Sequence, residues 1–124
     1  IDRSGAGRVV EVYPGASLRR WGLDTTGYRV SSDARTRLVA QLRHQASWLS
    51  LDTFVDAMIS SADALDAVIA ALSARASALG ICPPPPAEHA HLARVEGWIA
   101  LPPAGSLSEL RSVRDAARPD AESA

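Results

Sequence analysis

The sequence of 124 residues contains no lysine and a single cysteine, Cys82, and only 5% of its residues are aromatic. One cysteine excludes an internal disulfide and a cluster of zinc-binding thiolates. All 13 basic residues are arginine, which together with the many alanines is typical of a GC-rich bacterial genome. No apolar run approaches the ~20 residues that cross a membrane, and no stretch has the pattern of a signal peptide. We therefore expect a cytoplasmic protein without a membrane partner.

Charge is unevenly distributed along the chain, although the net charge is only −1. Residues 1–43 hold eight arginines and four acids, whereas the remainder holds five arginines and ten acids. A basic half is compatible with a polyanionic partner, but a strongly basic nucleic-acid binder shows a larger excess. The length suits one domain at most, and a hydrophobic fraction of 47% is enough for a core of alanine, leucine and valine.

The clearest predicted element is a helix over residues 60–79. Ser60 or Ser61 can cap its first turn, Gly80 ends it, and the prolines at 83–86 prevent a restart. Its apolar residues follow helical spacing and are Leu65, Val68, Ile69, Leu72, Ala76 and Leu79.

Asp63 and Asp66 lie three residues apart and therefore share one face of this helix. Such a pair can meet a carboxylate from a strand at a metal site. Asp63 also has a structural interpretation: a negative charge in the first turn stabilises the helix dipole by about 0.3–1 kcal/mol, and Asp63 can complete a capping box with Ser60. Asp66 lies one turn deeper among apolar residues, where an unpaired charge is costly.

Shorter elements are predicted on both sides of this helix. β-Branched residues predict a strand at 8–13, in which Glu11 is either a functional carboxylate or a solvent-facing residue of an edge strand. A second strand is predicted at 96–101. Helices are expected at 15–22, 31–49 and 50–59, a helical or irregular stretch at 88–94, and a weak helix at 107–114, with the last ten residues disordered. Arg35 lies mostly outside the apolar stripe of the helix at 31–49.

Three motifs in this order resemble the C-terminal part of domain-of-unknown-function family 429. They are EVYP at 11–14 followed by LRRWGL at 18–23, DALDA at 63–67, and EGWI at 96–99 followed by Leu101 and Pro102. Proteins of that family are predicted nucleases with an RNase H-like fold. The resemblance implies an α/β fold: residues 1–103 form the C-terminal portion of an RNase H-like domain, mostly helical with about two short strands, and residues 104–124 form a flexible tail.

The same resemblance implies a site. In the RNase H-like superfamily, acidic residues on a central strand, a following strand and a late helix hold two Mg²⁺ ions. Glu11 matches the acid of the following strand, and Asp66 or Asp63 matches that of the late helix. Two Mg²⁺ (or Mn²⁺) ions ~4 Å apart activate water and stabilise the leaving oxygen of a phosphodiester. Arg19 and Arg20 are candidates for phosphate contacts, although arginines on helix surfaces often contact nothing specific.

The superfamily's first aspartate has no counterpart here, because its strand would precede Ile1. We therefore expect an incomplete site, in either the C-terminal piece of a longer protein or the remnant of a split gene. The favoured hypothesis is part of a metal-dependent nuclease. The alternative is a non-catalytic interaction module that docks a partner, such as the missing N-terminal segment of the fold, or a second copy of itself.

Overall fold

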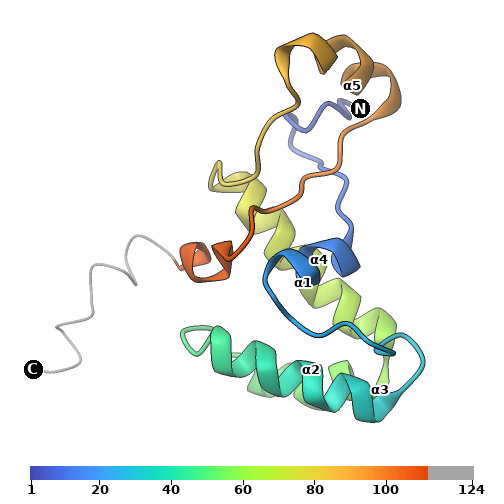
Figure 1. Ribbon diagram of the computed structural model, residues 1–124, viewed down its shortest axis with the longest axis vertical. Coiled ribbons are helices and arrows are strands. Elements are labelled where there is room, and N and C mark those ends of the chain that lie inside the picture. Colours follow the sequence, from blue (N-terminus) through green and yellow to red (C-terminus); the bar gives the residue numbers. More distant parts are fainter. Residues whose placement is uncertain (112–124) are drawn as a thin grey trace, which may run out of the picture.

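The structure is a computed structural model that describes residues 1–111. Its α-helices are α1 (Pro14–Arg20), α2 (Ser32–Gln45), α3 (Val55–Ser60), α4 (Ala62–Ala78) and α5 (Ala90–Glu96). Short 3₁₀ helices are η1 (Asp52–Phe54), η2 (Ala87–His89) and η3 (Ser106–Leu110). Figure 1 shows α1 to α4 gathered at one end of the molecule, with α5 and the N-terminal segment at the other. The mostly helical character that the sequence predicts is therefore confirmed.

Helix α4 is the central element and packs against α1, α3 and η3. It begins as predicted by a serine cap, since the Ser61 side chain accepts a hydrogen bond from the Ala64 N–H at 3.2 Å. At its other end Gly80 adopts a positive φ of 74°, which glycine allows without strain. The Ile81 N–H then bonds back to the Ala76 carbonyl at 2.9 Å and closes the helix.

The core is built mainly from the faces of α1, α2 and α4, with Met58 of α3 between them. The contact between α1 and α4 includes one serine from each helix. The Oγ atoms of Ser17 on α1 and Ser73 on α4 lie 2.8 Å apart, and both residues are fully buried. Ser73 donates to the Ile69 carbonyl at 2.9 Å, so Ser17 is left to donate to Ser73. Small side chains bring the two helices close, and each buried hydroxyl is satisfied.

Part of the predicted tail belongs to this core. The sequence predicts flexibility from residue 104, whereas Leu107 and Leu110 of η3 are buried against the helices. The Trp21 indole N–H donates to Ser106 Oγ at 3.2 Å, and the Arg75 Nε–H donates to the Leu110 carbonyl. The remainder of the predicted tail, including the last ten residues, lies outside the described residues.

The two predicted strands do not form within residues 1–111. In their place a single parallel bridge joins Glu11 to Ile99, and the Ala100 N–H donates to the Glu11 carbonyl at 2.7 Å. The stretch at 8–13 ends where Pro14 starts α1, and Glu96 belongs to α5. Two strands without a third neighbour are marginal in water, so the α/β prediction gives way here to helices with one isolated bridge.

No helix among residues 1–111 is both long and apolar enough to span a bilayer.

Candidate functional site

A tight loop between α1 and α2 positions half of the candidate site. Gly27 has a φ of 70°, and its carbonyl accepts the Ser31 N–H at 3.0 Å just before α2 begins. Arg35 fastens this loop: its Nε–H donates to the Ile59 carbonyl at 2.7 Å and its Nη1 to the Tyr28 carbonyl at 3.0 Å. The prediction that Arg35 lies outside the buried stripe is therefore wrong, because only 8% of the residue is exposed. Backbone carbonyls partner its buried guanidinium.

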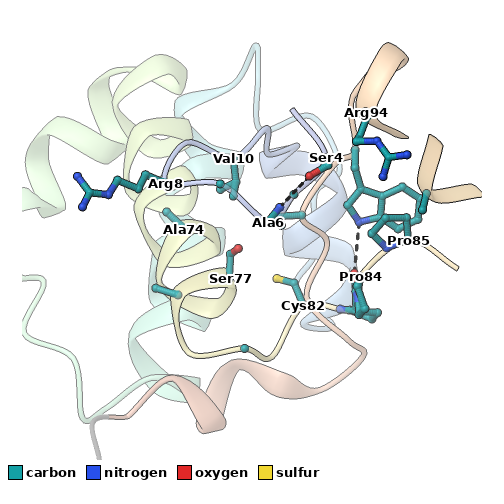
Figure 2. Close-up of a pocket in the computed structure, with 18 residues that line it drawn as sticks. Ser4, Ala6, Arg8, Val10, Ala74, Ser77, Cys82, Pro84, Pro85 and Arg94 are labelled. Carbon is teal, nitrogen blue, oxygen red and sulfur yellow. Dashed lines mark hydrogen bonds between the residues drawn. The ribbon is translucent and has the colours of Figure 1, made fainter. Parts of the chain in front are cut away.

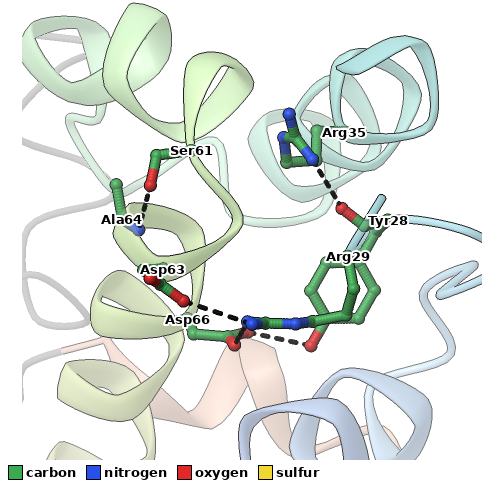
Figure 3. A network of polar contacts seen from close by, with 7 residues as sticks. All are labelled: Tyr28, Arg29, Arg35, Ser61, Asp63, Ala64 and Asp66. Atoms are coloured by element: carbon green, nitrogen blue, oxygen red, sulfur yellow. Dashed lines mark hydrogen bonds and ion pairs between the residues drawn. The ribbon is translucent and has the colours of Figure 1, made fainter. Parts of the chain in front are cut away.

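The first two turns of α4 supply the other half of the site (Figure 3). The Tyr28 hydroxyl donates to Asp66 Oδ1 at 2.8 Å. The Arg29 guanidinium donates to Asp66 Oδ2 through Nη1, and its Nη2 lies 3.2 Å from Asp63 Oδ1. The two aspartates predicted to share a helix face thus converge on one cationic group, and both oxygens of Asp66 have a partner.

Burial separates the roles of these side chains. The Asp63 side chain is 90% exposed, whereas the Asp66 side chain is only 25% exposed. Burial, followed by the hydrogen bond to Asp66, raises the pKa of Tyr28 to about 12, so the phenol stays protonated as a donor. The hydrogen bond to Asp63, followed by the charge of Asp66, raises the pKa of Arg29. Asp66 is therefore the anchored carboxylate and Asp63 the accessible one.

An open pocket of about 620 Å³ lies beside this network and is lined by Asp63, Asp66 and Arg29. Arg19 lines the same pocket, and its guanidinium carbon lies 5.8 Å from the centre of the Tyr13 ring. Arg20 lines a different pocket, beside Trp98 and Ile99. The structure thus brings Arg19 to the aspartates but places Arg20 elsewhere.

Glu11 does not line the pocket of the two aspartates. Its Oε1 lies 2.6 Å from Arg3 Nη2, and the hydrogen bond from Arg3 lowers the pKa of Glu11. A β-carbon on Gly97 would lie only 2.2 Å from Glu11 Oε2, so glycine is required there to leave room for the carboxylate. The third predicted ligand is therefore engaged in a separate ion pair beside Gly97.

The described residues do not fit a two-metal site. Carboxylate oxygens are suitable donors for Mg²⁺, but the guanidinium groups of Arg29 and Arg3 already bind the three predicted carboxylates. Among residues 1–111 no cluster of three histidine, cysteine, aspartate or glutamate side chains is arranged to hold a metal ion. A divalent ion at Asp63 and Asp66 would compete with Arg29 for the same oxygens.

Sequence reasoning missed Tyr28 and Arg29, which lie between the helices predicted at 15–22 and 31–49. Tyr28 lies 38 residues before Asp66, and Arg29 lies 34 and 37 residues before Asp63 and Asp66. No local pattern in the sequence links positions so far apart. The one available signal is the glycine at 27, which marks a sharp turn immediately before them.

Comparison with known protein families identifies the family of the chain. The profile of the family described as "Protein of unknown function (DUF429)" matches residues 1–91, and the chain belongs to this family. The match confirms the resemblance and includes the motifs of Glu11 and of Asp63 and Asp66. No curated protein and no solved structure matches the chain.

Proposed function

We propose that this chain is part of a metal-dependent nuclease of RNase H-like type, to which it contributes Asp66 and Asp63. The observation that supports the proposal is the convergence of the two carboxylates on one cationic group at an open pocket (Figure 3). Two oxygens that jointly bind a guanidinium are also donors for a hard divalent cation such as Mg²⁺ or Mn²⁺.

In this proposal the site is incomplete within residues 1–111, and further ligands come from outside them. Arg29 neutralises the aspartates, and their oxygens would hold a divalent ion only where Arg29 released them. Arg19, which lines the pocket, contacts the phosphate of a nucleic acid, and Arg20 extends the basic surface. Glu11 joins the ligand set only if Arg3 releases it, because the two side chains form an ion pair.

Paramagnetic Mn²⁺ provides a direct test. We expect low Mn²⁺ concentrations to broaden the backbone amide signals of residues 27–30 and 61–67. Arg29→Gln should strengthen the broadening because it removes the competing cation, and Asp66→Asn should abolish it. Arg37→Gln is a matched control, since Arg37 is exposed on α2, does not line the aspartate pocket and takes part in none of the ion pairs described here. Broadening that persists unchanged in Asp66→Asn would contradict the proposal.

Catalysis is tested separately. The purified chain should not cleave DNA or RNA with Mg²⁺ or Mn²⁺, because a site that lacks a carboxylate holds the metals poorly. Metal-dependent cleavage that Asp66→Asn abolishes would show that the chain carries a complete site.

A second candidate function is that of an interaction module, and the bridge between Glu11 and Ile99 favours it. Within residues 1–111 the bridge leaves backbone groups of the two segments without a further strand, and such edges invite pairing. Apolar side chains around it are exposed: 61% for Val9, 52% for Tyr13 and 49% for Ile99. The occupant in this proposal is an extended segment of a second copy of the chain.

Sedimentation and hydrogen exchange test this second function. The chain made alone should self-associate with rising concentration, and Val9→Asp should weaken the association. Residues 62–78 should remain protected as helix in either state. A compact monomer at all concentrations, with strongly protected amides at residues 9–12, would contradict the interaction module.

A further inference from the structure

A second cavity, of about 760 Å³, lies away from the aspartates, between the N-terminal segment and the C-terminal end of α4 (Figure 2). The proline connector (residues 83–86), through its first three prolines, and Trp98 line its remaining sides. Its volume falls within the roughly 300–1,000 Å³ of small-molecule sites. Small residues create the space: Gly5 and Gly7 on one side, and Ala74, Ala78 and Gly80 on α4 and its end. The cavity is thus large enough for a ligand with a ring system.

The charged side chains that line this cavity are both arginines. Arg8 and Arg94 line it, and no aspartate or glutamate is among the described residues that do. Neither arginine forms an ion pair within residues 1–111. Asp2 lies outside the lining; hydrogen bonds from Ser4, one of them from the Ser4 N–H at 2.8 Å, lower the pKa of Asp2, and the charge of Arg94 contributes a smaller part. Figure 2 shows Arg8 and Arg94 on opposite sides of the cavity, with Ser77 and Cys82 between them. Two arginines that line the cavity and form no ion pair within residues 1–111 favour an anionic ligand.

Trp98 provides a flat apolar wall with a fixed orientation. Its indole N–H donates to the Pro83 carbonyl at 3.3 Å, which tethers the ring to the proline connector. On the other side of the cavity mouth, a β-carbon at Gly5 would lie 2.8 Å from Trp98 Cδ1, so glycine lets the N-terminal segment approach the ring closely. A fixed indole is a stacking surface for a planar heterocycle, and base–aromatic stacking contributes about 1–3 kcal/mol per base.

We propose that this cavity binds a nucleoside phosphate, either free or as an unpaired nucleotide in a strand. The base stacks on Trp98, and the phosphate is bound by Arg94 or, on the opposite side, by Arg8. The Ser77 hydroxyl is available to the sugar or the base edge. This assignment rests on an aromatic wall beside two arginines that form no ion pair within residues 1–111, and it is independent of the carboxylates of Asp63 and Asp66, which line a different pocket.

The experiment compares four probes in EDTA, so that divalent ions play no part: dAMP, deoxyadenosine, inorganic phosphate and a short single-stranded oligodeoxyadenylate. Calorimetry measures affinity, and the three tryptophan indole N–H signals report location by NMR. We expect dAMP or the oligonucleotide to shift the Trp98 signal while the signals of Trp21 and Trp48 stay in place. Binding of dAMP without the strand indicates a free nucleotide, and binding of the strand without dAMP indicates a single-stranded nucleic acid.

Variants separate this site from the aspartate pocket. One of the two variants Arg94→Gln and Arg8→Gln should weaken binding about tenfold, since the arginine that binds the phosphate loses a charge-assisted hydrogen bond. Arg37→Gln, the control for lost charge at a site remote from the cavity, and Asp66→Asn should bind as the wild type does. Trp98→Phe should retain part of the affinity and Trp98→Leu should not, with folding of each variant checked by its amide spectrum. Equal binding of inorganic phosphate and dAMP, binding that leaves the Trp98 signal in place, or no binding of either nucleotide probe would overturn the assignment.

Discussion

Two regions of this molecule treat their apolar side chains in opposite ways. Residues 14–79 with η3, here called the helical region, enclose the core, and Leu18, Leu38, Leu42, Leu65 and Ile69 are wholly inaccessible. Residues 1–13 and 80–103, the open region, expose half or more of Val9, Leu92 and Val95 and have one bridge between Glu11 and Ile99. The helical region satisfies its backbone within each helix, whereas extended segments need neighbours to do so. The open region is therefore where a bound ligand or partner would cover the most exposed apolar surface and pair the most backbone groups.

The largest expected effect tests whether stability resides in the helical region. Leu65→Ala should cost about 2–5 kcal/mol of unfolding free energy, because it opens a cavity in a closed core. Leu92→Ala, at a side chain that is 50% exposed, should change stability by less than about 0.5 kcal/mol. Chemical denaturation of both variants measures the difference. Similar losses in the two would mean that the open region contributes equally to folding.

Alkaline pH should weaken the link between the loop and α4 in the helical region. The pKa of Tyr28 rises from an unfolded value of 10.0 to about 12 in the folded protein. The unfolded chain therefore loses its proton first, and stability that is fully present below pH 10 falls between pH 10 and 12, by about 2–3 kcal/mol.

Denaturation at several alkaline pH values measures this loss. Tyr28→Phe should remove most of the decline, whereas Tyr13→Phe, at an exposed ring, should leave it intact. A decline that is equally steep in Tyr28→Phe would refute the assigned cause.

A smaller effect is expected at the bridge of the open region. Gly97 has a φ of 94°, and a β-carbon there would overlap Glu11 Oε2. Gly97→Ala should cost about 1–2 kcal/mol of backbone strain and displace Glu11, with faster hydrogen exchange at the Ala100 amide as the readout. Gly80→Ala is the matched control, since its φ of 74° is also positive but no atom lies within 4 Å. Equal exchange at Ala100 in the two variants would show that space beside Glu11 is unimportant.

The smallest expected effect concerns the ion pair of Arg3 and Glu11. The hydrogen bond from Arg3 lowers the pKa of Glu11, and the pair is largely open to solvent. Arg3→Ala should raise that pKa toward its ordinary range, as followed by NMR titration of the side-chain carboxyl, with no measurable change in thermal stability. The stabilisation from the lowered pKa is present above the unfolded pKa and disappears as the pH falls through the folded one. An unchanged titration would mean that another group holds the carboxylate.

The helical region was largely predictable, because its signals are local. Ser61, the apolar spacing from Leu65 to Ala76, and Gly80 define α4 within one stretch of sequence. The open region was mispredicted as two strands, because β-branched residues at 8–13 indicate a preference for extended backbone but supply no partner strand. Of the candidate site, the proximity of Asp63 and Asp66 followed from helical spacing, whereas the separate ion pair of Glu11 did not.

By itself the sequence determined that helices form the core and, to within two residues, where α4 begins and ends, since capping and periodicity act within a few residues. It did not determine the end of α2, which lies at Gln45, four residues before the predicted end. It also determined membership of the DUF429 family, whose profile matches residues 1–91 and so includes the motifs at 11–23 and 63–67. Only the tertiary structure decided the partners of the charged groups. Arg29 reaches Asp63 and Asp66 across 34 and 37 residues, and Arg35 is buried against two carbonyls. The physical reason is that a charge is paired by whatever the fold brings within about 3 Å of it, and that neighbour is set by packing rather than by sequence distance.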